Sequence, residues 1–311
     1  MLRSLIGFIG LSLCLCNSSQ AASGYAGEFL ALGTGARALA LGSAYVALAD
    51  DASAGYWNAA GLASLGQRQA QVMHAERFSG LVQNDYLALA LPAQWIDGLA
   101  FSLIRVGVND IEFTALQDPD RPLGPNNRPL VASRANSADY ALYLSGGHNI
   151  TQRLAVGTSA KLIYRTVGDF SAYGLGLDLG LRYSLSHAFT LAANLRDLTT
   201  TPIIWDTDTT DRIQPSLLIG LAYTRPLGSG QASISFASRT GGDATDQGDN
   251  APLNLGVEYQ YQYIALRAGF EEDRQAFGLG LRPHKRLSLD LGYLQHDALE
   301  ATYRLSAGFD F

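Results

Sequence analysis

Apolar and polar residues alternate along most of this 311-residue chain, from about residue 67 to the C-terminal Phe311. Between Tyr173 and Leu185 every odd position is Leu or Tyr, and every even position is Gly, Ser, Asp or Arg. A period of two belongs to a strand with one apolar and one polar face. Tyrosines flank the leucines, as they do in strands whose apolar face meets lipid. The alternation therefore predicts a sheet and excludes a mostly helical fold.

The runs that keep this period predict about fourteen strands, with lengths near the roughly ten residues that a tilted strand needs to cross a bilayer. The predicted strands are residues 67–77, 82–91, 97–106, 137–148, 153–166, 172–185, 188–198, 213–225, 231–240, 251–261, 263–271, 275–282, 286–296 and 300–311.

The connections between these strands alternate in length. Every second connection is a short turn, whereas the others include the long ones, residues 107–136, 199–212 and 241–250. Bacterial outer-membrane barrels have short turns at the periplasmic end and longer loops outside. This alternation of short and long connections therefore favours an all-β transmembrane antiparallel barrel over the alternative, a soluble β fold.

The start of the chain has the form of a secretory signal peptide. It combines Arg3, an apolar run from Leu5 to Leu15 and small residues before a cleavage point after Ala21. Both cysteines, Cys14 and Cys16, lie within it. Lipidation is the alternative, but leucines stand where it requires a small residue. Cleavage would leave a mature chain without thiols.

Composition excludes several classes of function. A net charge of −6 is unsuited to a nucleic-acid partner. The acidic stretches at residues 205–211 and 241–249 lack the spacing of a calcium loop, and the five histidines are not spaced as metal ligands. We therefore expect no cofactor, no metal and no enzyme activity.

A barrel of this size is wider than its own side chains can fill. Residues 22–66 are rich in Ala and Gly, do not alternate, and predict short helices and turns that plug the lumen. The polar positions of the strands would face this plug. They include Lys161, Arg165, Asp178, Arg182, Arg196, Glu258, Arg267, Arg282, Asp290 and Arg304.

The plug segment carries a signature. Gly35-Ala36-Arg37, Gly42 and Asp50-Asp51 are followed by Trp57-Asn58 and Gly61. This stretch resembles the N-terminal signature of the PorV/PorQ family of outer-membrane proteins, relatives of the FadL fatty-acid channel. The resemblance implies a fourteen-strand barrel with an N-terminal plug. It also implies either type IX secretion, with secretion-system or cargo proteins as partners, or passage of a hydrophobic small molecule. Ala59 stands where the family usually has proline.

The signature residues also have structural interpretations. Asp50 and Asp51 could bind a ligand, or could cap a helix and form ion pairs within the plug. Arg37 would pair with them or with a luminal carboxylate. Trp57 and Asn58 could line a solute path or pack the plug on the wall. The luminal charges could select a solute or form a network that braces the plug.

The chain ends on an alternating run with Tyr303, Phe309 and Phe311 on its apolar side. A last strand with a terminal aromatic resembles the signal read by the outer-membrane assembly machinery. We expect that machinery and outer-membrane lipid as partners, and we expect removal of Phe311 to impair assembly. Gly180, at a luminal position, is expected to tolerate serine.

The sequence thus predicts a signal peptide over residues 1–21, a plug over 22–66 and an outer-membrane barrel over 67–311. The main functional hypothesis is a non-enzymatic role in protein secretion or surface attachment. The alternative is a FadL-like channel for hydrophobic molecules.

Overall fold

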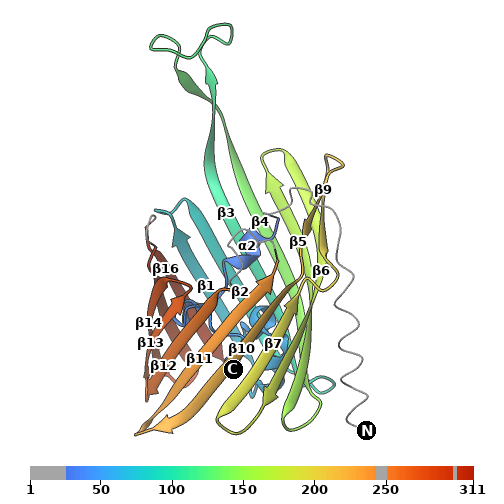
Figure 1. Cartoon of the computed structure of the whole chain (residues 1–311), viewed down its shortest axis with the longest axis vertical. Coiled ribbons are helices and arrows are strands. Elements are labelled where there is room, and N and C mark those ends of the chain that lie inside the picture. Colours follow the sequence, from blue (N-terminus) through green and yellow to red (C-terminus); the bar gives the residue numbers. More distant parts are fainter. Residues whose placement is uncertain (1–25, 243–250, 297–299) are drawn as a thin grey trace.

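The computed structural model describes residues 26–242, 251–296 and 300–311. They form a closed antiparallel barrel with a small helical segment inside it (Figure 1). The strands are β1 (Gln69–Arg77), β2 (Val82–Pro92), β3 (Gly98–Leu116), β4 (Pro129–Asn149), β5 (Leu154–Val167), β6 (Phe170–Ser184), β7 (Phe189–Arg196), β8 (Thr201–Trp205), β9 (Thr210–Ile213), β10 (Ser216–Leu227), β11 (Gly230–Gly241), β12 (Leu253–Tyr261), β13 (Ile264–Glu271), β14 (Arg274–His284), β15 (Leu287–Leu294) and β16 (Thr302–Asp310).

The barrel closes because β1 pairs with both β2 and β16, and β5 pairs with β6. Strands β8 and β9 are a short hairpin that pairs with the upper part of β6, over Ala172–Gly174, beyond the stretch where β6 pairs with β7. The other fourteen strands form the wall. The predicted fold class, a barrel of about fourteen strands with a partly helical N-terminal plug, is confirmed.

The longest predicted loop, residues 107–136, is wrong in part. Strand β3 continues to Leu116 and β4 begins at Pro129, and the two pair with each other far beyond the wall (Figure 1). Their neighbours stop earlier, because β2 last pairs at Val108 and β5 at Ser137. Likewise, the predicted loop 199–212 contains β8 and most of β9. Most of the third predicted loop, 241–250, lies outside the described residues, as does the predicted signal peptide.

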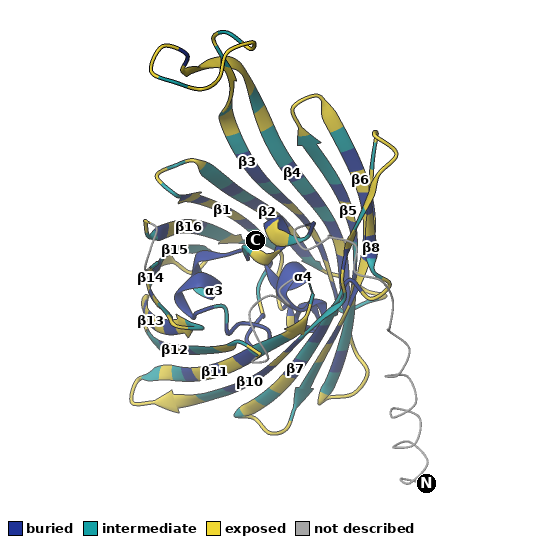
Figure 2. Ribbon diagram, turned by 45° about the horizontal axis from the view of Figure 1, so that its top comes forward, coloured by how far each residue is buried: buried dark blue, intermediate teal, exposed yellow. Residues whose placement is uncertain are grey.

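The alternation of the strands sorts side chains between the two faces of the wall. On β6, Leu175, Leu177 and Leu179 are exposed on the outer face, whereas Asp178 and Gly180 are buried against the lumen. The same pattern recurs around the barrel (Figure 2). In the part of the chain that the structure describes, no helix is both long and apolar enough to cross a membrane.

The lumen holds residues 26–66, hereafter the plug (Figure 2). It comprises α2 (Glu28–Ala31), α3 (Ala36–Ala40), α4 (Ala54–Trp57) and the 3-10 helix η1 (Ala59–Ser64). Helix α3 lies against β13–β16, α4 against β3 and β4, and η1 against β3–β6. The plug is buried nearly throughout, so its alanines and leucines form the core of the protein.

Glycines in the wall let the plug approach the strands at backbone distance. A methyl group added to Gly157 on β5 would overlap the backbone of Ala59 and Ala60, and one added to Gly180 on β6 would overlap the Asn58 side chain. This contact argues against the expectation that Gly180 tolerates serine, because the buried Asn58 side chain of the plug occupies the space that the luminal glycine leaves free.

Candidate functional site: the plug and the luminal charges

Arg37 is the centre of the contacts between the plug and the wall. Helix α3 points its guanidinium at β12, where Nε and Nη2 donate to the two carboxylate oxygens of Glu258, each at 2.9 Å. On the plug side, Nη1 donates to Asp50 at 2.8 Å and to the Tyr45 hydroxyl at 3.1 Å. The fork geometry of a guanidinium is suited to such two-point recognition of a carboxylate.

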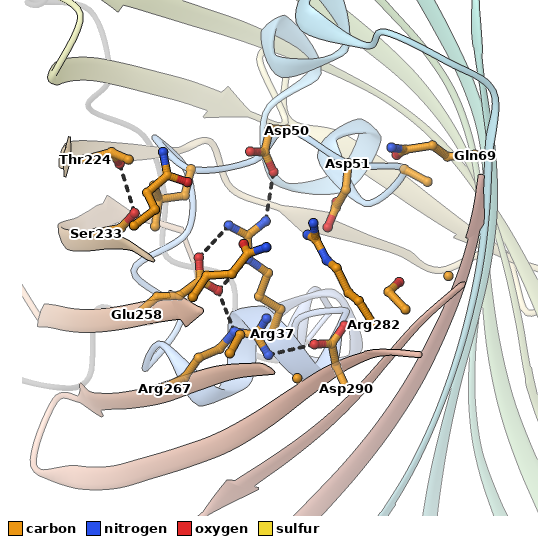
Figure 3. A pocket seen from close by; sticks show the side chains of 18 of the residues that line it. Arg37, Asp50, Asp51, Gln69, Thr224, Ser233, Glu258, Arg267, Arg282 and Asp290 are labelled. Carbon is orange, nitrogen blue, oxygen red and sulfur yellow. Dashed lines mark hydrogen bonds and ion pairs between the residues drawn. The ribbon is translucent and has the colours of Figure 1, made fainter. Parts of the chain in front are cut away.

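The same network continues along the wall (Figure 3). Arg267 on β13 donates to Glu258 and, through Nη1, to Asp290 on β15, each at 2.6 Å. Charges of alternating sign thus run from Asp50 in the plug to β15. Both arginines share Glu258, which is 4% exposed, so each buried charge has an opposite partner.

Asp51 takes no part in this chain of ion pairs. Its carboxylate accepts hydrogen bonds from the Ser53 backbone N–H at 2.9 Å and from the Tyr45 hydroxyl at 2.8 Å. These bonds fix the turn that leads into α4.

Below the plug, at the end of the barrel that carries the short turns, lies a cavity of about 620 Å³, hereafter the vestibule. Arg37, Asp50 and Asp51 form part of its roof, and Arg282 and Lys285 stand on its rim. Figure 3 shows the charged side chains that converge there. The lining is mainly polar, which suits water and polar solutes more than an apolar ligand.

A second buried cluster lies on the opposite wall. Lys161 on β5 contacts Asp178 on β6 at 2.9 Å and Asp197, just after β7, at 2.8 Å. Thr201 donates to Asp197, and the Asp197 backbone N–H donates to Asp178. The cluster ties together the point at which the chain leaves β7 and enters the β8–β9 hairpin.

Arg165 and Arg196 contact the plug through aromatic rings. Arg165 pairs with Asp139 at 2.7 Å and lies over Phe29 of α2, 5.3 Å from the ring centre. Arg196 lies 4.5 Å from the ring centre of Tyr56 and 5.7 Å from that of Trp57. Such cation–π contacts favour arginine over a smaller cation.

The signature residues Trp57 and Asn58 hold backbone. The indole N–H of Trp57 donates to the Thr34 carbonyl at 3.0 Å. Asn58 donates to the carbonyls of Val46 and Leu181 and accepts from the Ala60 N–H, so it holds the start of η1 at Ala59. The signature glycines lie in or beside plug turns: Gly35 before α3, Gly42 after it and Gly61 in η1.

The remaining predicted residues are spread over the barrel. Arg182 donates to Ser64 of the plug, Arg282 is exposed at the vestibule rim, and Arg304 is fully buried against the plug. The aromatic residues of the last strand face outward, with Phe309 and Phe311 stacked at 6.1 Å.

Sequence reasoning missed several members of these clusters. Asp139 and Asp197 complete ion pairs and Tyr45 hydrogen-bonds Arg37, yet Tyr45 sits in a non-periodic segment and Asp197 follows the end of a strand. Asp139 alternates in step with Ala141 and Tyr143 on the luminal face of β4, and this pattern could have placed it in the lumen from the sequence. Across the described residues, no group of three or more His, Cys, Asp or Glu side chains is placed to hold a metal ion.

No known family profile matches the sequence, and no curated protein matches it. Solved structures that resemble it include a FadL homologue from Pseudomonas aeruginosa, 12% identical, with a TM-score of 0.53 over 89% of this chain and 98% of that chain. The Pseudomonas putida toluene transporter TodX is 14% identical, with a TM-score of 0.51 over 89% and 96%. A TodX mutant described as a monoaromatic hydrocarbon channel is 13% identical, with a TM-score of 0.50 over 83% and 94%. At these identities the likeness shows the fold alone, and that fold is the barrel of FadL- and TodX-type outer-membrane proteins.

Proposed function

We propose that this protein is a non-enzymatic transport barrel of the bacterial outer membrane, closed at rest by its plug, that passes a small hydrophobic molecule. The observation that carries the proposal is the plug itself, which fills the lumen and is held by ion pairs such as Arg37–Glu258. The similar solved structures, named as a FadL homologue and a toluene transporter, support it.

The two ends of the barrel support an orientation for this role. The short turns, the start of β1 and the end of β16 lie beside the vestibule. The β3–β4 and β8–β9 hairpins lie at the other end of the barrel (Figure 1). Outer-membrane barrels place short turns in the periplasm. A solute from outside would therefore meet α2 and α4 first, and the polar vestibule only after the plug had shifted.

An uptake assay tests the proposal. Cells that produce the protein in their outer membrane are compared with cells that lack it, with radiolabelled toluene and oleate as the hydrophobic probes and glucose as the polar control. We expect faster initial uptake of one hydrophobic probe and unchanged uptake of glucose. Equal uptake of both hydrophobic probes by the two strains, at normal levels of folded protein, would overturn the proposal.

A second candidate function, binding of a partner protein in secretion or surface attachment, is favoured by the β3–β4 hairpin. Beyond the wall, both faces of this two-stranded ribbon are open to solvent, and Phe113, Leu123 and Leu130 are each more than half exposed. Its tip is nonetheless fixed, because the Asn127 side chain bonds the Asp118 backbone N–H and carbonyl. The resemblance of residues 35–61 to PorV/PorQ proteins, which serve type IX secretion, supports the same role.

Shortening the ribbon separates the two functions. Replacement of residues 110–135 by a two-residue turn leaves the paired wall and the plug untouched. If the protein is a channel, hydrophobic uptake persists in this variant. If the ribbon binds a partner, the secretome or the set of surface-attached proteins changes while uptake stays normal.

A further inference from the structure

Four buried polar atoms around one turn of the plug have no hydrogen-bond partner in the protein. They are Thr34 Oγ1, Gln71 Oε1, Asn84 Oδ1 and Arg304 Nε. Thr34, Asn84 and Arg304 are each 0% exposed, and Gln71 is 8% exposed. A buried polar group without a partner destabilises the folded state, so four at one place need a physical reason.

The four atoms surround the turn formed by residues 32–35. Arg304 donates to the carbonyls of Leu32 at 2.9 Å and Gly35 at 3.2 Å, and Asn84 donates to the Gly33 carbonyl at 3.4 Å. In the wall, Arg304 on β16 and Asn84 on β2 are both register partners of Ala75 on β1.

Gln71 completes the group; it precedes Ala75 by four residues on β1 and lies on the same face of the strand. Its amide nitrogen would lie 3.8 Å from a methyl group placed on Gly35. Gln71 also lines the vestibule. The group therefore reaches from the middle of the barrel to the vestibule along the β16–β1–β2 side of the plug, hereafter the seam.

At several other contacts between the plug and the wall the polar groups are paired. On β4 and β5, Ser145 and Ser159 both donate to the Gly55 carbonyl, at 3.1 and 2.9 Å. On β7, Asn194 donates to the Trp57 carbonyl at 2.9 Å. Of the six buried side-chain atoms without a partner in the described residues, four lie at the seam, and the other two are Ser102 Oγ on β3 and Arg182 Nε on β6. The unpaired atoms therefore gather on one side of the plug.

The kinds of atom at the seam select the occupant. Two of them, on Gln71 and Asn84, are acceptors, Arg304 Nε is a donor, and the Thr34 hydroxyl is both. A small anion would satisfy the donors only. Water donates and accepts, and makes two to four hydrogen bonds in buried sites of this kind.

We propose that the seam is a hydrated site, in which internal water joins Arg304, Thr34 and Asn84 and reaches the vestibule past Gln71. Where wall glycines such as Gly157 bring β5 against plug backbone, by contrast, the close contact leaves no room for water. The proposal is independent of what the barrel transports.

Thiol exchange with heavy water tests this site. After residue 16 the chain has no cysteine, so a single introduced thiol has a clean infrared S–H band. We would introduce Thr34→Cys and Asn84→Cys at the seam and Ser145→Cys as the dry control, since Ser145 is also buried, at 1% exposed. Folding of each variant is checked first by gel electrophoresis, in which a folded barrel gives a band that shifts when the sample is heated.

On transfer of folded protein to heavy water, we expect the S–H band of the seam variants to be lost at least a hundredfold faster than that of Ser145→Cys. In denaturant all three should exchange alike. Equal persistence of the folded seam and control bands would overturn the proposal. Should either seam variant fail to fold, the other gives the same comparison, and Gln71→Cys provides a third position. Exchange at the seam that stops when chloride replaces an inert anion would mean that an anion, and not water, is the occupant.

Discussion

At the scale of single residues, the luminal carboxylates act in ion pairs with arginine or lysine and not as isolated ligands. Alternation in the sequence placed Glu258, Arg267 and Asp290 on the inner face, because neighbours on a strand must point to opposite sides. The expectation that Arg37 pairs with a luminal carboxylate did not say which one, and the partner, Glu258, lies 221 residues further along the chain. The odd or even position of a residue in a strand predicts which face of the wall it lies on. A partner so distant in sequence is instead determined by how the strands close around the plug.

The first prediction is that Glu258→Gln loosens the plug. Glu258 accepts from both Arg37 and Arg267, and an amide would leave two largely buried guanidinium groups short of a counter-charge. Breaking a buried pair in this way costs about 3–5 kcal/mol of unfolding free energy. Urea unfolding of the protein in lipid vesicles measures it.

The matched control is Arg134→Gln, which breaks the exposed pair with Glu112 on the ribbon. An exposed pair contributes less than about 1 kcal/mol. If both variants lost the same stability, the network would not brace the plug.

At the scale of elements, the sequence predicted strands correctly where successive residues alternate between an exposed apolar face and a luminal face. It missed strands where this alternation is absent. All fourteen wall strands were predicted, because one face of each is apolar and exposed and the other faces the lumen. The outer parts of β3 and β4 are exposed on both faces, and β8 and β9 are only five and four residues long, so a period of two gives little signal there.

The second prediction concerns how η1 is seated on β5. Gly157→Ala places a methyl group against the backbone of Ala59 and Ala60, which cannot move without shifting η1. Overpacking of this kind costs about 1–3 kcal/mol, and the heat-modifiable band should unfold at a lower temperature. Gly124→Ala at the ribbon tip, where a methyl group meets nothing closer than 4.0 Å, should behave as the parent chain. A neutral Gly157→Ala would mean that the plug is not in firm contact with β5.

At the scale of the whole molecule, the proposed outer-membrane location would place the bilayer around the outer belt of leucines and aromatic residues. The third prediction is that Leu179→Arg, at a position 44% exposed on the outer face of β6, costs about 2–4 kcal/mol if it lies near the bilayer midplane. Folding titrations into lipid vesicles measure this loss. The same change at Leu123, on the ribbon tip, should cost nothing measurable. Equal tolerance at the two leucines would place Leu179 outside the hydrocarbon. The roles of Phe311 in assembly and of the segment before residue 26 stay predictions.

The ribbon has a consequence for what can reach each part of this protein. Eight residues of β3, 109–116, run beyond the last pairing with β2, which at about 3.4 Å per residue carries the tip roughly 25 Å past the wall. In the proposed orientation, a large particle that approaches the cell surface, such as a virus or an antibody, would touch Leu123 and its neighbours before any other described part of the barrel. The plug, enclosed by the strands, is open only to bodies narrower than the lumen. Size alone therefore decides which part of the protein an approaching particle contacts first. Large particles contact the ribbon, and small molecules reach the plug.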